Sequence, residues 1–474
     1  MRSICVFLII FTTVAAFGQS GRITAAPASD QVSPGNGDPA LTVKQMFDEA
    51  NDYIKKKAAE NDAKKISFSE KLFDQARLEQ RQLAAKYAAT VGVRKDLAGD
   101  DLYYLGMLHW IAENLDGTVE NLRKYVVIDA TMPDRRQRAR SILVVALAKQ
   151  NKLSDAETVL SDYLKSEPAT PAERARMEGE MAKAYQAQKD FARMAPHADE
   201  DYKAAKAAAK DASSRTTALQ EIFDAGSLVF EANRDLGNQK NAEAALEDLR
   251  SIAAAAASAD LYYYVVDQKI KYLIETGRKA AAQEYYMTSL VRAESAFGVA
   301  ALRADVVSRL KKRERHYRLL GEPAPELPMI DQWFPGERKT FADLKGKVIL
   351  LDFWATWCGP CYETFPLLKE WQQDFSRDGL VILGVTKYYG MVNGQPATEP
   401  AEIEELKRFR ERQQLPYDLL VAKDSSSQLL YGGTALPTTV LIDKKGIIRY
   451  LESGTSKMRL VQIRAMIEKL LAEK

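Results

Sequence analysis

The chain has 474 residues, of which 46% are hydrophobic and 28% are charged. That composition is typical of globular proteins, and the length exceeds one ordinary core, so we expect two or more domains. The 67 basic and 65 acidic residues leave a net charge of +2, which provides no strong field toward nucleic acid or an anionic membrane. We therefore predict no nucleic-acid partner.

The N-terminus has the pattern of an export signal. Arg2 precedes the apolar run 4–17, which is short for a membrane span. Ala16 and Gly18 provide the small side chains that signal peptidase accepts before a cleavage site. We predict a signal peptide over residues 1–18 and an exported protein, periplasmic in a Gram-negative cell. An uncleaved N-terminal anchor remains the alternative.

Residues 19–40 are predicted to be a flexible linker, because proline, glycine and small polar residues dominate its second half. From residue 41 to 315 the pattern is helical, with scarce proline and apolar residues recurring three and four apart. A weak repeat with an offset of 38 residues begins at Leu115, Leu153 and Phe191. The sequence therefore predicts a series of helical hairpins.

The repeat resembles the tetratricopeptide class, whose unit has about 34 residues. An irregular α-helical bundle is the alternative. Arrays of this class leave one face open to other chains, so the resemblance implies a protein or peptide partner on the helical region.

A second linker is predicted over residues 316–328, where Pro323, Pro325 and Pro328 prevent a regular helix. In residues 329–474 short apolar runs alternate with helical patterns, which predicts an α/β domain. We expect strands over 348–353, 380–385, 417–421, 438–442 and 447–451, and helices over 359–375, 402–413 and 458–471.

The first of these strands leads into Trp357-Cys358-Gly-Pro-Cys361. Of the three cysteines, Cys5 lies in the predicted signal peptide, so the mature chain would contain two thiols, Cys358 and Cys361. Residues three apart in the first turn of a helix lie on one side and can close a disulfide. The helix N-terminus favours a thiolate on Cys358. We therefore expect an exposed, nucleophilic Cys358 and a resolving Cys361.

Other uses of two nearby cysteines fit the sequence poorly. A structural zinc site needs four ligands, and no second Cys or His pair is present. Covalent haem attachment needs His after the second cysteine, where this chain has Tyr362. A disulfide that closes so small a loop would stabilise little. We predict redox activity with no metal, haem or other cofactor.

Four segments carry a closer resemblance: Gly-Glu-Pro-Ala-Pro-Glu-Leu at 321–327, Leu-Lys-Gly-Lys-Val-Ile-Leu-Leu-Asp at 344–352, the dithiol motif ending at Cys361, and Leu-Pro-Thr-Thr-Val-Leu-Ile-Asp at 436–443. Together they resemble the exported TlpA/ResA branch of thiol–disulfide oxidoreductases, which have the thioredoxin fold. The resemblance covers residues 321–474, so the expected architecture is an α-helical repeat or bundle followed by an α/β thioredoxin-fold domain.

The resemblance implies roles for individual residues. Cys358 would attack and Cys361 would resolve. Pro437 would be the cis-proline beside the dithiol, and Leu436 and Trp357 would contact the extended chain of a partner.

The resemblance also implies that Asp352 is a buried acid that relays the proton of Cys361. Members close to ResA carry glutamate three residues after the second cysteine, where this chain has Thr364. Glu363 is one position away, which turns its side chain by about 100° on a helix. The relay would then rest on Asp352 alone.

These features predict an exported thiol–disulfide oxidoreductase that acts on protein disulfides, with the reductant direction favoured, and that draws electrons from a membrane or periplasmic donor. One alternative is a helical-repeat scaffold protein with an accessory redox domain. Another is a peroxidase, which needs Pro-x-x-x-Thr-x-x-Cys; Thr356 stands two residues before Cys358 rather than three. The stretch 388–400 looks like an insertion that shapes the partner groove.

Overall fold

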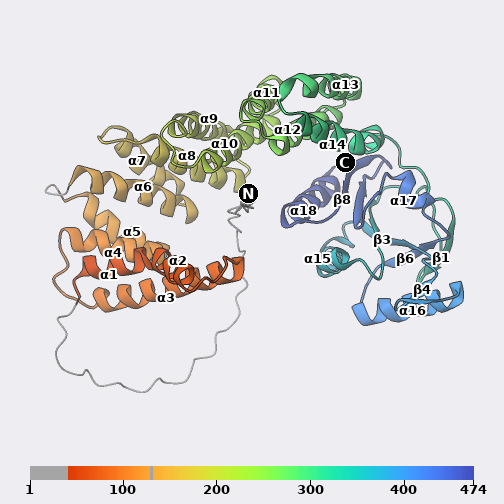
Figure 1. Cartoon of the computed structure of the whole chain (residues 1–474), viewed down its shortest axis with the longest axis horizontal. Helices are drawn as coiled ribbons and strands as arrows, with labels where there is room; N and C mark the ends of the chain where they lie inside the picture. The colour runs from red at the N-terminus through yellow and green to blue at the C-terminus, as the bar shows by residue number, and fades with distance from the viewer. Residues whose placement is uncertain (1–40, 129–131, 474) are drawn as a thin grey trace, which may run out of the picture.

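The computed structural model describes residues 41–128 and 132–473, so the predicted signal peptide and first linker lie outside the described residues. Helices α1 to α14 follow one another along an arc, and a sheet domain lies at the C-terminal end of that arc (Figure 1). No helix within the described ranges is long and apolar enough to cross a membrane. The predicted order, a helical region followed by a thioredoxin-like α/β domain, is confirmed.

The helical region is built from hairpins of neighbouring helices. Helices α5, α7 and α9 begin at Leu115, Leu153 and Phe191, which confirms hairpins at the predicted offset of 38 residues. Gly237 and Gly277 adopt positive φ in the turns between paired helices. The helices are α1 (Val43–Asn51), α2 (Tyr53–Ala63), α3 (Glu70–Gly92), α4 (Asp100–Ile111), α5 (Leu115–Val126), α6 (Pro133–Lys149), α7 (Leu153–Leu164), α8 (Pro171–Ala187), α9 (Phe191–Ala208), α10 (Arg215–Asp235), α11 (Gln239–Ala255), α12 (Ala259–Glu275), α13 (Lys279–Ala296) and α14 (Ala300–Leu319).

The C-terminal domain has a six-stranded sheet with the order β1-β6-β3-β2-β7-β8. Strands β2, β3 and β6 are parallel, so their carboxyl ends share one edge, and the other pairs are antiparallel. Its elements are β1 (Ile330–Phe334), β2 (Val348–Phe353), α15 (Gly359–Phe375), β3 (Leu380–Lys387), β4 (Met391–Val392), β5 (Gln395–Pro396), α16 (Glu399–Gln413), β6 (Asp418–Ala422), α17 (Ser426–Leu430), β7 (Thr438–Ile442), β8 (Ile448–Ser453) and α18 (Lys457–Ala472).

The two faces of the sheet belong to different apolar cores. Val348 and Leu350 of β2 pack with helices α15, α16 and α18. Ile349 and Leu351, whose side chains alternate to the opposite face, join a core that continues into the helical region. The C-terminal domain therefore shares one of its cores with the helices that precede it.

Helix α14 continues to Leu319, into the stretch predicted as a linker, because its last turns pack against the sheet domain. Arg313 bonds both carboxylate oxygens of Glu452 in β8, at 2.9 Å from Nη1 and 2.7 Å from Nη2. The Nε2 of His316 lies 2.9 Å from the carbonyl oxygen of Gly432. The side chains of α14 therefore contact both β8 and the loop that precedes β7.

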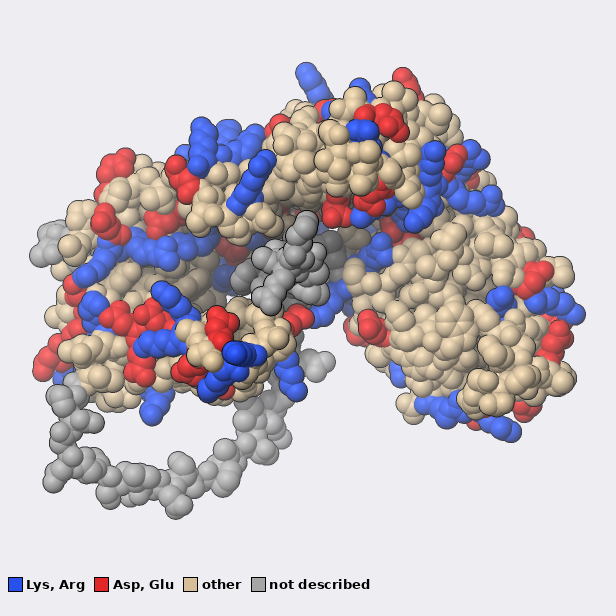
Figure 2. All heavy atoms as spheres, in the orientation of Figure 1, with Lys and Arg blue, Asp and Glu red and all other residues tan. Residues whose placement is uncertain are grey.

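The surface differs between the two regions. Basic and acidic side chains alternate over the helical region, whereas the visible face of the sheet domain carries few of either sign (Figure 2). The face of the sheet domain seen in this view is therefore largely uncharged.

Candidate active site

The dithiol lies where β2 passes into α15. Cys358 is the N-cap residue of α15, and it is joined to Cys361 by a disulfide with Cα atoms 5.4 Å apart. The prediction of an exposed Cys358 is wrong for this oxidised form, because the bond to Cys361 in the core leaves Cys358 only 4% exposed. The exposed neighbour is Trp357, at 62%.

Pro437 lies next to the loop that carries the dithiol. The Leu436–Pro437 peptide bond is cis, as predicted. Phe353 pairs with Thr438, so Pro437 falls beside the residues that follow β2. The backbone N–H of Gly454 donates to the Pro437 carbonyl at 2.7 Å, which anchors this loop to the end of β8.

Asp352 is on the face of β2 that packs against the cluster containing both cysteines. Its side chain is 1% exposed, and neither carboxyl oxygen has a hydrogen-bond partner among the described residues. Burial raises its pKa to about 7. A carboxyl group with this pKa can accept and release protons near neutral pH.

Neither Thr364 nor Glu363 adds a second acid beside the disulfide. The hydroxyl of Thr364 is buried and donates to the carbonyl of Cys361 at 2.7 Å, within its own helix turn. Glu363 is exposed. Its exposure agrees with the expectation that it does not substitute for the missing glutamate.

Three residues near Asp352 are absent from the predicted site. Trp354 and Tyr417 are buried, and both carry a polar atom without a partner among the described residues. Gly384 stands opposite Asp352 in β3. A glycine inside a strand pattern, such as Gly384, is a sequence signal that another chain segment approaches closely. Nothing in the sequence links Tyr417 to Asp352.

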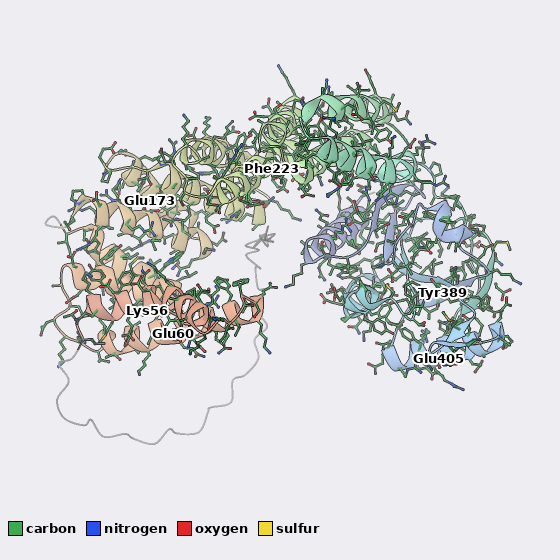
Figure 3. All side chains as sticks on the ribbon, viewed as in Figure 1. Lys56, Glu60, Glu173, Phe223, Tyr389 and Glu405 are labelled. Atoms are coloured by element: carbon green, nitrogen blue, oxygen red, sulfur yellow. A yellow bond between two sulfur atoms is a disulfide. The ribbon has the colours of Figure 1, made fainter. Side chains whose placement is uncertain are left out.

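The stretch 388–400 forms the short β4–β5 hairpin and the start of α16. Tyr389, labelled within the sheet domain in Figure 3, packs edge-on against Trp357 with ring centroids 5.4 Å apart. The buried Glu402 accepts the backbone N–H groups of Tyr389 and Gly390, both at 2.8 Å. The stretch is therefore fastened beside the residue that precedes the dithiol.

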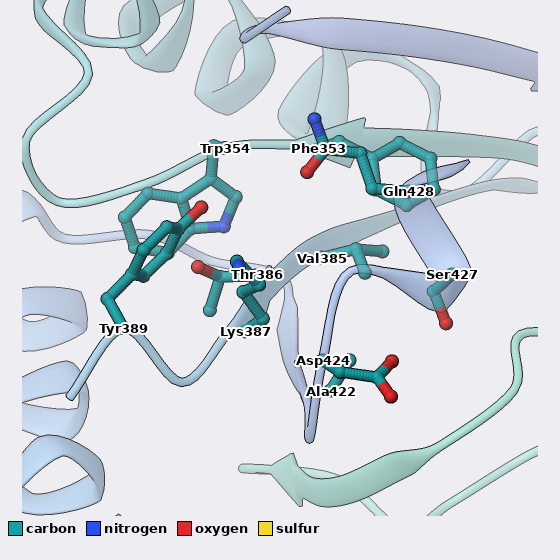
Figure 4. A pocket seen from close by; sticks show the side chains of 10 residues that line it. All are labelled: Phe353, Trp354, Val385, Thr386, Lys387, Tyr389, Ala422, Asp424, Ser427 and Gln428. Atoms are coloured by element: carbon teal, nitrogen blue, oxygen red, sulfur yellow. The ribbon is translucent and has the colours of Figure 1, made fainter. Parts of the chain in front are cut away.

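A small pocket opens at the carboxyl ends of β2, β3 and β6. Figure 4 shows Trp354 and Tyr389 at one end of it and Asp424 and Ser427 at the other. This is the edge at which parallel strands commonly offer a binding site. The pocket is lined by Phe353, Trp354, Val385, Thr386, Lys387, Tyr389, Ala422, Asp424, Ser427 and Gln428. Within residues 41–128 and 132–473, no group of three or more His, Cys, Asp or Glu side chains is arranged to hold a metal ion.

A cysteine pair at the start of a helix, beside a cis-proline and on a mixed sheet of this order, defines a dithiol–disulfide protein of the thioredoxin-like class. The family model described as AhpC/TSA family matches residues 320–451.

Two relatives are each similar to under a third of this chain. The thiol-disulfide oxidoreductase ResA of Geobacillus thermodenitrificans is 30% identical over 136 residues, which are 29% of this chain and 70% of that protein. The thioredoxin-like protein YneN of Bacillus subtilis is 30% identical over 135 residues, or 28% of this chain and 72% of that protein. A crystal structure of a thioredoxin-like superfamily protein is 27% identical, with a TM-score of 0.28, and the match covers 32% of this chain and 97% of that one. The chain belongs to the ResA-like family of thiol-disulfide oxidoreductases.

Proposed function

We propose that Cys358 and Cys361 exchange electrons with disulfides of other proteins, mainly as a reductant. The Cys358 thiolate attacks a partner disulfide and forms a mixed disulfide, releasing one partner thiolate. The Asp352 carboxylate then takes the proton of Cys361, and the resulting thiolate attacks Cys358 and releases the second partner sulfur. The two released partner thiolates take up the protons that Cys358 and Cys361 gave up, the latter held by Asp352, so one partner disulfide becomes two thiols while two thiols of this chain become one disulfide.

The observation that carries this proposal is the arrangement of three groups. Cys358 caps a helix whose N-terminus favours a thiolate. Cys361 follows one turn later in the core, and the unpaired carboxyl of Asp352 lies on the sheet face packed against it. Nucleophile, resolving thiol and proton acceptor are thus present together.

Trp357, Leu436 and Pro437 would hold the partner. Trp357 is exposed and braced by Tyr389. Leu436 packs partly against the cluster that contains the cysteines. An extended partner chain could run between these residues with its disulfide at Cys358.

The Gly359-Pro360 pair between the cysteines, which is also found in reducing thioredoxins, supports the reductant direction. In this role the protein works outside the cytosol and is recharged by a membrane or periplasmic donor, since extracytosolic thiols need a dedicated electron supply. The reduction potential tests the direction: a reductant is expected near about −270 mV, and a value near about −120 mV would make the protein an oxidant.

The helical region would recruit the partner whose disulfide is reduced. It is joined to the sheet domain through α14, so a chain bound along the arc would be kept close to the dithiol. The increase in effective concentration would speed exchange without a change in the chemistry.

Replacing the attacking thiol tests the mechanism. Cys358→Ser is expected to abolish the reduction of insulin disulfides. Cys361→Ser is the matched control: it retains the nucleophile, so it should accumulate a mixed disulfide that cannot resolve. Full activity of the Cys358→Ser protein would show that the mechanism is wrong.

A further inference from the structure

Four buried polar atoms without a hydrogen-bond partner lie near one register position of the sheet. They are the two carboxyl oxygens of Asp352, Nε1 of Trp354 and the hydroxyl of Tyr417. Buried polar groups are nearly always paired in folded proteins. A concentration of unpaired groups next to the proton relay therefore calls for a functional explanation.

Gly384 brings these atoms together. It is the residue of β3 paired with Asp352, and side chains at paired positions of neighbouring strands leave the sheet on the same face. Where a Cβ of Gly384 would lie, Nε1 of Trp354 is 3.1 Å away and Cε2 of Tyr417 is 3.3 Å away. Since Cε2 adjoins the carbon that bears the hydroxyl, both donors reach the strand position beside Asp352.

The three groups are chemically complementary. An indole N–H can only donate and a tyrosine hydroxyl can donate, whereas a charged carboxylate can only accept. A carboxylate that is buried without donors is strongly destabilised relative to its protonated form. We propose that Tyr417 and Trp354 are positioning residues for Asp352, and that they supply the hydrogen bonds that stabilise its carboxylate when it becomes charged.

The other polar groups that surround Asp352 do not take the place of Tyr417 and Trp354 as donors to its carboxylate. From α15 the neighbouring group is the disulfide between Cys361 and Cys358, which does not titrate. Burial raises the pKa of Tyr417, and the charge of Arg410 in α16 works in the opposite direction. The Nε of Arg410 donates to the backbone carbonyl of Tyr417 at 3.2 Å. Thr439 of β7, which pairs with Asp352, does not titrate, and Glu452 of β8 is neutralised by cations of the helical region. Burial is the cause that raises the pKa of Asp352.

The consequence for exchange follows from the role of Asp352 as a base. Only the charged carboxylate can accept the proton of Cys361, so loss of a donor would leave less of the active form at neutral pH. The free energy of a hydrogen bond to a charged group corresponds to a shift of about one to two units in the pKa of that group. This last step rests on the proposed function; the stabilisation of Asp352 itself does not.

The test is a titration of the Asp352 carboxyl in the full-length oxidised protein, by its carboxyl ¹³C shift, in the wild type and in Tyr417→Phe. The variant should show a pKa of Asp352 that is higher by about one unit or more. Tyr450→Phe is the matched control, because it also removes a buried hydroxyl without a partner, on β8. It should leave the titration unchanged.

An unchanged or lowered pKa in Tyr417→Phe would overturn the proposal, as would an equal rise in both variants. If Tyr417→Phe does not fold, Trp354→Phe removes the other donor and is expected to shift the pKa in the same direction.

A kinetic comparison separates this proposal from the proposed function. At pH 7, Tyr417→Phe should slow exchange about fivefold, because a rise of one unit from a pKa of about 7 lowers the carboxylate fraction of Asp352 from about one half to about one tenth. In an Asp352→Asn background the same substitution should have no further effect. A shifted titration with unchanged exchange would uphold the role of Tyr417 and reject Asp352 as the relay.

Discussion

Two buried carboxyl groups of this protein share a row of the sheet but have opposite surroundings. Asp352 in β2 and Glu452 in β8 are each paired across Thr439 of β7. Burial raises the pKa of Asp352 to about 7. Burial also pushes up the pKa of Glu452, but the charges of Lys271 and Arg313 outweigh it and hold that pKa below its usual range.

The difference in surroundings separates a structural carboxylate, Glu452, from a carboxyl group that can take up and release protons, Asp352. Glu452 is closed off by cations from α12 and α14 and joins the helical region to the sheet domain. Asp352 has no partner among the described residues and lies near the dithiol. Two buried carboxyl groups thus give a charged group at the junction and a titratable group in the proposed active site.

The largest effect is expected from breaking the junction pair. Arg313→Ala would leave the buried carboxylates of Glu452 and Asp267 to share Lys271, so that one buried negative charge loses its cation, which should cost about 3–5 kcal/mol of unfolding free energy. Urea unfolding of the oxidised protein measures this. The control is Arg464→Ala on α18, whose partners Glu370 and Asp374 are exposed, with an expected cost below about 1 kcal/mol. Equal losses in the two variants would remove the distinction between the junction and a surface ion pair.

A gain in stability is expected when the active-site carboxyl is replaced. Because Asp352 binds its proton more tightly in the folded state, it costs stability as pH rises from about 4 to about 7. Asp352→Asn should therefore add about 4 kcal/mol to the unfolding free energy at pH 8 and almost nothing at pH 4. Urea unfolding at both pH values checks this. A difference that does not change with pH would show that Asp352 has an ordinary pKa in the folded protein.

Much of the fold can be predicted because it depends on local patterns. The apolar run of β2, the helix that begins after Cys358 and strand β7 have the predicted bounds. Strand β1 (Ile-Asp-Gln-Trp-Phe) escapes prediction because it is short and polar residues interrupt it. Helix α14 extends past its predicted end because Arg313 and His316 find their partners in the sheet domain, which no local pattern reveals.

The site was predictable to the extent that it lies within one motif. The cysteines and Asp352 are close in sequence, and Pro437 follows from the family resemblance. Tyr417 could not be inferred, because its approach to Asp352 depends on the missing side chain of Gly384 and on the order of three strands.

The most direct test of the role of Asp352 is the rate of thiol–disulfide exchange between pH 5 and pH 9 in the wild type and in Asp352→Asn. The wild-type rate should rise with an inflection near pH 7, where the carboxyl of Asp352 loses its proton. The variant should lack this inflection and be slower by about 100-fold at pH 8, the contribution expected of a general base. Identical rates and pH profiles in the two proteins would contradict a proton relay through Asp352.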